Sequence, residues 1–104
     1  MDIDTDVLKL YDKRYEVCGE ALRAIRERTG VSQSAFAEMC GWRPQYQHHL
    51  ERTPNVTVGE SAARVISGVL DEIKAEAAAR AAEDVARREK LLDDVLDQLD
   101  QPSD

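Results

Sequence analysis

The sequence predicts an all-α protein, with a head of four or five helices followed by one long C-terminal helix. Within residues 31–52, apolar residues recur at three- and four-residue steps, which is the spacing of two short helices with a tight turn between them. From residue 69 to residue 101 there is neither glycine nor proline, so no residue in that stretch signals the end of a helix. The length of 104 residues suits one domain with an appendage.

Residues 1–19 are expected to form either a helical extension of the domain or an arm. Val7, Tyr11, Tyr15 and Cys18 recur at three- and four-residue steps, which suits an amphipathic helix that packs on the domain. An arm that reaches into a nucleic-acid groove is disfavoured, because the four aspartates of this segment would meet phosphates. Of the two alternatives, the helix is favoured.

The next two helices are expected at about 20–28 and 33–40. In the first, Leu22 faces the core. Ser32 can cap the second, because its hydroxyl can accept hydrogen bonds from N–H groups that have no helical partner. Gly41 follows where the end of a helix favours a left-handed residue.

A further short helix is expected at about 44–52, with the sequence PQYQHHLER. Pro44 suits its first turn, where the missing N–H costs nothing. Leu50 turns inward, and Trp42 supplies a bulky apolar plug just before the helix. Most of the remaining side chains of this helix carry hydrogen-bonding groups. This is typical of a helix that packs on a neighbouring helix and inserts its exposed face into the groove of a ligand.

A fourth helix is expected from about Gly59 to about Leu99, a length of ~60 Å. Thr57 and Glu60 have the spacing of a capping box, in which each side chain satisfies a free N–H group of the first turn. Apolar residues continue along this helix with coiled-coil-like spacing, interrupted at Arg88. We therefore expect the acidic, alanine-rich residues 71–104 to mediate self-association, in a parallel or an antiparallel sense. A solvated acidic helix is the alternative.

The acidity of the chain is concentrated in this C-terminal part. The net charge is −7, of which residues 1–70, with nine basic and ten acidic residues, contribute only −1. Residues 71–104 hold five basic and eleven acidic residues and contribute −6. Because the Debye length is ~8 Å at physiological salt, a distant acidic segment repels DNA only weakly at a binding face. The head itself is close to neutral, so modest non-specific affinity for DNA is expected.

Residues from about 19 to 70, half of the chain, carry the motif LRxIRxxxGxSQxxFAxxxG, followed nine residues later by Leu50 and Glu51. This segment resembles the Cro/CI-type (XRE-type) helix-turn-helix regulators of phages and bacteria. The resemblance implies a lambda-repressor-like helix-turn-helix head in residues 20–70. It also implies a structural ion pair between Arg26 and Glu51, late in the second helix of the motif. The alternative is two solvated surface charges.

The second helix of such a motif enters the DNA major groove, and its first turns meet base edges. By resemblance, Gln45 and His49 match base-reading positions, and a glutamine can pair with adenine through two hydrogen bonds. Tyr46 and His48 are further candidates for base contact, and Tyr46 could also reach a phosphate.

Three residues are candidates for phosphate contact. Gln33 stands at a helix N-terminus, where free N–H groups and the helix dipole favour an anion, and the family uses a glutamine there. Arg43 lies just before the second helix of the motif, and Arg52 lies on the same side of that helix as Gln45.

Gln47 departs from the family pattern, which has an aliphatic residue facing the core at this position. Either Gln47 is buried with a partner, or the helix rotates slightly and Tyr46 takes over the packing. The choice decides which side chains of the helix face outward.

Several other functions are disfavoured by the sequence. The adjacent histidines, His48 and His49, point about 100° apart on a helix and have no third ligand at helical spacing, so no metal site or other cofactor is expected. Cys18 and Cys40 have no redox or metal-binding spacing and are interpreted as reduced thiols. There is no set of catalytic residues, no phosphate-binding loop and no sign of a small-molecule ligand, so no enzyme is expected. No apolar run approaches the ~20 residues of a membrane helix, and the acidic start is not a signal peptide.

The sequence therefore predicts a cytoplasmic, sequence-specific DNA-binding regulator of a bacterium or phage-infected cell. It is expected to be a homodimeric repressor that binds a double-stranded operator through residues 44–52 and dimerises through the C-terminal helix. The alternative is a protein-interaction module with the same motif, for example an antitoxin, an anti-restriction or anti-CRISPR factor, or a polymerase-associated factor. The near-neutral head and Gln47 favour this alternative.

Overall fold

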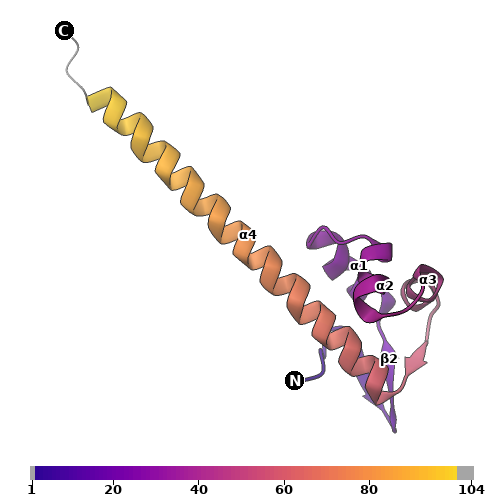
Figure 1. The fold of residues 1–104 in the computed structure, drawn as a ribbon. Coiled ribbons are helices and arrows are strands. Elements are labelled where there is room, and N and C mark those ends of the chain that lie inside the picture. The colour runs from indigo at the N-terminus through magenta and orange to yellow at the C-terminus, as the bar shows by residue number, and fades with distance from the viewer. Residues whose placement is uncertain (1, 101–104) are drawn as a thin grey trace. The chain divides into compact units, whose positions relative to one another are not determined.

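The structure, a computed structural model, describes residues 2–100 of the chain. Its helices and strands follow one another in the order β1 (Leu8–Tyr11), β2 (Arg14–Val17), α1 (Gly19–Arg28), α2 (Gln33–Cys40), α3 (Pro44–Arg52), β3 (Thr57–Val58) and α4 (Glu60–Asp100) (Figure 1). The chain divides into two compact units, the first ending at Lys74 and the second beginning at Ala75, so that α4 contributes to both.

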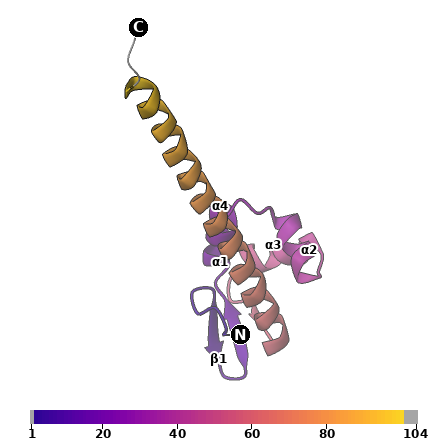
Figure 2. The same cartoon turned by 60° about the vertical axis from the view of Figure 1, so that its left-hand side comes forward.

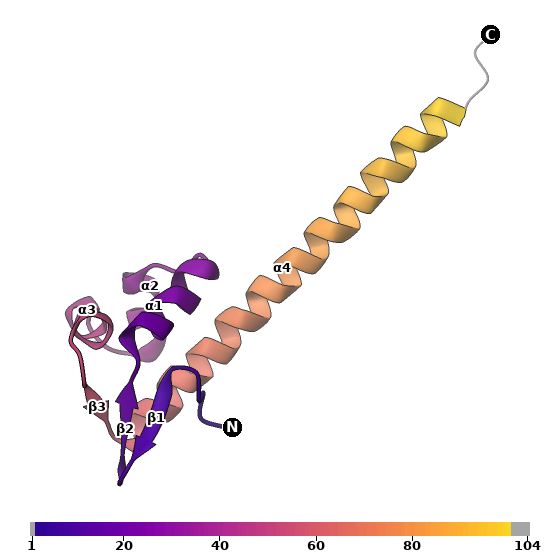
Figure 3. The same cartoon turned by 180° about the vertical axis from the view of Figure 1, so that it is seen from behind.

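The first unit contains a three-stranded antiparallel sheet with the strand order β1-β2-β3. Figure 3 shows the three strands side by side, and in all three views α1, α2 and α3 gather at the end of the hairpin opposite to its turn (Figures 1 to 3). The hairpin pairs Leu8 with Val17 and Tyr11 with Arg14. The all-α prediction is therefore wrong, because the protein has both a sheet and helices.

Residues 1–19 were expected to form a helix or an arm, with the helix favoured, and the predicted helix is wrong, because residues 8–17 form the β1–β2 hairpin. The hairpin turn contains Asp12 with φ of 58°, a left-handed conformation that aspartate tolerates better than most residues. Leu8 and Val17 face each other across the strands and are buried. Cross-strand packing of this kind outweighs a helical spacing that the same residues also satisfy.

The capping box predicted for the start of the last helix does not form. Thr57 instead belongs to β3, where its hydroxyl oxygen accepts a 3.0 Å hydrogen bond from Nε of Arg14 and its carbonyl oxygen accepts a 3.1 Å bond from the same guanidinium. Glu60 pairs with Arg64 at 2.8 Å. The helix begins at Glu60, and the N–H of Ala63 donates to the Gly59 carbonyl oxygen at 3.0 Å.

One hydrophobic core holds the first unit together, and the sheet, α1, α2, α3 and the beginning of α4 all contribute to it. From α4 it receives a stripe of residues between Ala63 and Ile73. The segment before β1 is fastened to the same helix, because Asp4 pairs with Lys74 at 2.7 Å and its N–H donates to the Ser67 hydroxyl at 2.9 Å. The full core consists of Val7, Leu8, Val17, Leu22, Ile25, Phe36, Leu50, Val58, Ala63, Ile66, Val69, Leu70 and Ile73.

The second unit is the remainder of α4, described from Ala75 to Asp100. The helix was predicted to run to about Leu99, and its observed end at Asp100 confirms the long C-terminal helix. Six large apolar side chains of this unit are about half exposed or more. Between residues 2 and 100, no helix combines the length and the apolar character that crossing a membrane requires.

Candidate nucleic-acid interface

Helices α2 and α3 form a compact pair joined by a three-residue turn, and local chemistry explains where each begins and ends. The Ser32 hydroxyl accepts a 3.0 Å hydrogen bond from the N–H of Ala35, which caps α2. Gly41 ends α2 with φ of 85°, and the next N–H, that of Trp42, returns to the Ala37 carbonyl oxygen at 3.0 Å. The predicted bounds of both helices, 33–40 and 44–52, are confirmed.

Helix α3 has a buried face and an exposed face. Gln47, Leu50 and Glu51 are buried. The exposed face carries the side chains predicted to contact DNA from this helix, namely Gln45, Tyr46, His48, His49 and Arg52. Of the two alternatives for Gln47, burial with a partner is the one observed, because its side chain is fully buried and hydrogen-bonded at both ends.

A buried polar network fixes the inner face of α3. The Glu51 carboxylate accepts two hydrogen bonds from the Arg26 guanidinium, at 2.9 and 3.0 Å, which is the bidentate geometry of a strong pair. It also accepts one from the Gln47 amide at 2.8 Å and one from the Gln33 amide at 3.2 Å. Arg26 donates a further bond to the Val31 carbonyl oxygen at 2.8 Å, in the loop that leads into α2. The network therefore joins α1, α2 and α3 through one carboxylate.

This environment sets the ionisation of Glu51. Burial raises its pKa, but hydrogen bonds from Arg26, Gln47 and Gln33, together with the positive charge of Arg26, outweigh the burial. The pKa of Glu51 therefore lies below its ordinary value, and the carboxylate is ionised at neutral pH. An ionised carboxylate offers acceptors only, which matches the four donors that surround it.

Aromatic contacts order the exposed face of the same helix. Nε1 of Trp42 donates a 3.1 Å hydrogen bond to Oε1 of Gln47, which ties the turn to the buried network. Tyr46 packs edge-on against Trp42, with ring centroids 5.1 Å apart, and His49 stacks against Tyr46 at 6.4 Å. Nδ1 of His49 lies 3.0 Å from the Thr53 hydroxyl. Two of the predicted base-contact residues are thus held in place before any ligand arrives.

The three phosphate-contact candidates occupy different environments. Gln33 is partly buried at the start of α2 and donates to Glu51, a structural role that the sequence interpretation did not include. Arg43 is exposed at the N-cap of α3 and forms no salt bridge within residues 2–100. Arg52 is exposed in the last turn of α3.

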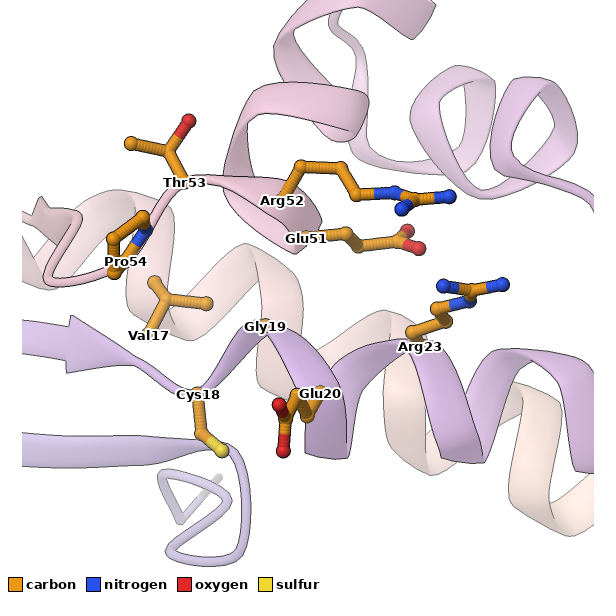
Figure 4. A pocket seen from close by; sticks show the side chains of 9 residues that line it. All are labelled: Val17, Cys18, Gly19, Glu20, Arg23, Glu51, Arg52, Thr53 and Pro54. Atoms are coloured by element: carbon orange, nitrogen blue, oxygen red, sulfur yellow. The ribbon is translucent and has the colours of Figure 1, made fainter.

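Helices α1 and α3 lie close together at Gly19, where a Cβ atom would lie 2.8 Å from the Leu50 carbonyl oxygen. Beside this contact lies an open cavity of about 410 Å³. Figure 4 shows Arg52 and Glu51 from α3 and Arg23 from α1 extending toward the same side of it. Arg23 is paired with Glu27 at 2.8 Å, so the cavity has charges of both signs. Its lining consists of Val17, Cys18, Gly19, Glu20, Arg23, Glu51, Arg52, Thr53 and Pro54.

The two thiols differ in their environments, and in the part of the chain that the structure describes the potential metal ligands do not cluster. Burial raises the pKa of Cys40 to about 12, so this thiol is protonated and unreactive at neutral pH, whereas Cys18 is exposed. In the described part of the chain, no three His, Cys, Asp or Glu side chains gather as a metal ion would require.

Comparison with known proteins finds no match. No family model fits the chain, and neither a curated protein nor a solved structure matches it.

Proposed function

We propose that this protein is a sequence-specific DNA-binding regulator, a homodimeric repressor that inserts α3 into the major groove of a double-stranded operator. The observation that supports this most directly is the two-sided character of α3. Its inner face is fixed by Leu50 and by the buried network around Glu51, while its outer face presents polar side chains. A helix that reads bases needs both properties, because its side chains must meet base edges in a defined position.

The outer face of α3 suits base recognition. Gln45, in the first turn, has the amide geometry that pairs with adenine, and His49 is one turn later on the same side. Arg43 and Arg52 stand at the two ends of the helix, where they would meet phosphates on either side of the groove. The Cro/CI-type resemblance of residues 19–70 also gives base-reading roles to Gln45 and His49. Such a regulator would work in the cytoplasm of a bacterial or phage-infected cell.

Dimerisation follows from the same proposal. A head with one short recognition helix and nearly neutral charge gains little affinity from phosphates alone. Two heads joined through the second unit would read two half-sites, spaced by one helical turn of DNA, about 10 bp, or a multiple of it. The exposed apolar side chains between Val85 and Leu99 provide the surface for this association.

A second candidate is a protein-interaction module built on the same helix pair. The observation that favours it is the aromatic cluster of Trp42 and Tyr46, because Tyr46 remains 38% exposed while packed on its neighbour. Tyrosine and tryptophan are enriched where proteins contact proteins. A binding surface of this type would depend on Tyr46 and not on Arg43.

A mobility-shift assay with DNA flanking the gene, at about 50 and 200 mM salt, tests the proposal. A regulator binds one discrete fragment and binds it less tightly at the higher salt concentration. We expect Gln45→Ala to cost ~1–3 kcal/mol on that fragment and to relax the requirement at one base position. Arg43→Ala should instead weaken binding to all sequences alike and lower the salt slope by about one.

Tyr46→Ala separates the two candidates when it is compared with Arg43→Ala. If the parent shifts no fragment, the DNA-binding proposal is wrong. If the parent shifts a fragment and Arg43→Ala leaves the salt slope unchanged, Arg43 does not contact a phosphate. Loss of a protein partner in Tyr46→Ala, with Arg43→Ala unaffected, would then support the interaction module. All three substituted side chains are exposed, so we expect the variants to remain folded.

A further inference from the structure

The imidazole of His49, on the exposed face of α3, is held at one of its two ring nitrogens. Nδ1 lies 3.0 Å from the hydroxyl oxygen of Thr53, the C-cap residue of the helix. One face of the ring stacks on Tyr46, with centroids 6.4 Å apart and planes inclined by 29°. Within residues 2–100, the second nitrogen, Nε2, forms no hydrogen bond. The ring is therefore fixed along one edge, and the nitrogen at its far end is available to a ligand.

Thr53 is itself fixed to the same residue. Its backbone N–H donates to the carbonyl oxygen of His49 at 3.0 Å, which brings the threonine side chain beside the imidazole. Its backbone angles, φ of −88° and ψ of 127°, lie in the β region and end the helix at this residue. The contact between the two side chains is thus set by the end of α3 and forms without a ligand.

Two arrangements of hydrogen atoms fit this contact. In the first, the hydroxyl donates to Nδ1 and the ring proton is on Nε2. In the second, the ring proton is on Nδ1 and is donated to the hydroxyl oxygen. The first is favoured, because an imidazole nitrogen is a stronger acceptor than a hydroxyl oxygen. Since the hydrogen bond at one ring nitrogen sets the state of the other, His49 would present Nε2–H as a donor.

A donor at this position distinguishes bases by the acceptors that they present in the major groove. Guanine presents two adjacent acceptors, N7 and O6, whereas adenine and cytosine each present an amino group, a second donor that would repel Nε2–H. Thymine offers one acceptor beside a methyl group. Gln45, one turn earlier on the same side of α3, carries both a donor and an acceptor and suits adenine. The two residues therefore differ in the base that each prefers.

We propose that Thr53 is a positioning residue that fixes His49 as a hydrogen-bond donor, and that His49 reads a guanine of the operator through Nε2–H. This inference rests on the proposed function and names the base that one residue of α3 recognises. The opposite arrangement of the ring proton would present an acceptor at Nε2 and would select an amino group. The two arrangements thus lead to opposite base preferences.

Nitrogen-15 NMR of the full-length protein locates the ring proton without DNA. Long-range proton–nitrogen correlation spectra at about pH 8.5, where a histidine is ordinarily neutral, distinguish a protonated ring nitrogen from a bare one. The chain contains two histidines, so His48→Gln assigns the signals. We expect a protonated Nε2 and a hydrogen-bonded Nδ1 in His49. Thr53→Val should shift the Nδ1 signal, and Thr53→Ser should restore it. A proton on Nδ1, or a Thr53→Val spectrum identical to that of the parent, would overturn the role of Thr53.

Binding to altered operators tests the guanine. Each base pair of the fragment that the parent shifts is replaced by the other three, and relative affinities are measured by competition. We expect the parent to favour guanine about tenfold at one position, and His49→Ala to lose that preference. Thr53→Val should lower it by about threefold, because the ring then turns and exchanges its proton freely, and Thr53→Ser should keep it. The matched control, Gln45→Ala, should relax a different position and leave the guanine preference unchanged.

The two measurements separate the ways in which the proposal can fail. An adenine or a cytosine at the position that depends on His49 would show that Nε2 is an acceptor. An unchanged guanine preference in Thr53→Val would remove Thr53 as a positioning residue. If the parent binds no discrete fragment, the proposed function fails and the guanine assignment fails with it, whereas the NMR spectra still decide whether Thr53 orients His49. Discrete binding that His49→Ala leaves unchanged at every position would overturn the guanine assignment alone.

Discussion

Gln47 shows how a single polar residue fixes the setting of a helix. Its amide oxygen accepts a hydrogen bond from the Trp42 indole and its amide nitrogen donates to Glu51, so the residue links the turn before α3 to the ion pair beneath it. In the part of the chain that the structure describes, no buried side-chain nitrogen or oxygen lacks a hydrogen-bond partner. A fully satisfied buried network specifies one arrangement, because any rotation of the helix would break several bonds at once.

Gln47→Leu should therefore destabilise the protein. We expect a loss of ~1–2 kcal/mol in the free energy of unfolding in urea, since the Trp42 N–H loses its partner and Glu51 loses one donor. Trp42 is the single tryptophan of the chain, so its fluorescence reports on the same turn. Gln45→Ala, on the exposed face of α3, is the control and should change stability by less than about 0.5 kcal/mol. Equal stability of Gln47→Leu and the parent would show that the network is dispensable.

Glu51 should make the stability of the protein depend on pH. Its pKa in the folded state is lower than the ordinary value of 4.5, so its contribution to stability is complete above about that pH. The contribution is lost as the pH falls through the lower folded-state pKa, because protonation then removes the charge that Arg26 requires. We expect the free energy of unfolding to decrease as the pH falls below about 4.5.

Glu51→Gln provides the comparison for this prediction. It should cost ~3 kcal/mol near neutral pH, because Arg26 remains buried without its counter-charge. The stability of the variant should also depend less steeply on pH over the acid range than that of the parent. Parallel pH profiles for the two proteins would mean that another carboxylate is responsible for the acid sensitivity.

At the scale of whole elements, the sequence predicted α2 and α3 to the residue, because local signals mark their ends. The Ser32 cap and the left-handed Gly41 act within a few residues of where they stand. The sheet has no such signals. Its β3 is two residues long and pairs with β2 across more than 40 residues of chain, and Val7, Tyr11, Tyr15 and Cys18 fit a helical period by coincidence.

In the candidate site too, local patterns in the sequence predicted some features and not others. Exposure of Gln45, His48 and His49 follows from helical period alone and was predicted. The bonds of Gln33 and Gln47 to Glu51 could not be predicted, because they depend on where α2 and α3 meet, which no local pattern specifies. The polar character of Gln47, at a position expected to be buried, was the one signal in the sequence that pointed to the network.

The junction of α1 and α3 gives a prediction about packing. Gly19 opens α1 where a Cβ atom would collide with the backbone carbonyl groups of Leu50 and Glu51. We expect Gly19→Ala to lower the free energy of unfolding by ~1–3 kcal/mol, because rigid backbone cannot move away as a flexible side chain would.

Gly59→Ala is the matched control for this change. No atom lies within 4 Å of the Cβ position there, so the substitution should be neutral or stabilise the protein by ~0.4–1 kcal/mol. The stabilisation arises because alanine has less conformational freedom than glycine in the unfolded chain. The unfolding temperature of Gly19→Ala should therefore fall below that of the parent, while that of Gly59→Ala should stay the same or rise. A Gly19→Ala protein that unfolds at the temperature of the parent would show that α1 and α3 can separate at this point at no cost.

For the molecule as a whole, the hydrophobic core lies in the first unit, and most of the net negative charge lies in the second. Every residue of the core precedes Lys74, so the first unit contains what it needs to fold. Most of the negative charge lies after residue 70, where the exposed apolar side chains between Val85 and Leu99 also lie. In the proposed function, the head would meet DNA with little net charge, and the second unit would supply association. Affinity for an operator should depend on the connection between two heads more than on the charge of either.

Deletion of residues 79–104 tests this dependence. For the intact protein, adding a second half-site to a DNA duplex should raise affinity by about 10²–10⁴-fold, because the second head binds at the effective concentration set by the first. For the truncated protein the gain should be about twofold, the statistical value for two independent sites. Affinity for a single half-site should be nearly equal in the two proteins at physiological salt, since the deleted charges are screened. Fluorescence-anisotropy titrations of duplexes with one and with two half-sites measure all four constants. If the truncated protein keeps the large gain, the heads pair through the first unit, and the exposed apolar side chains of the second unit have another use.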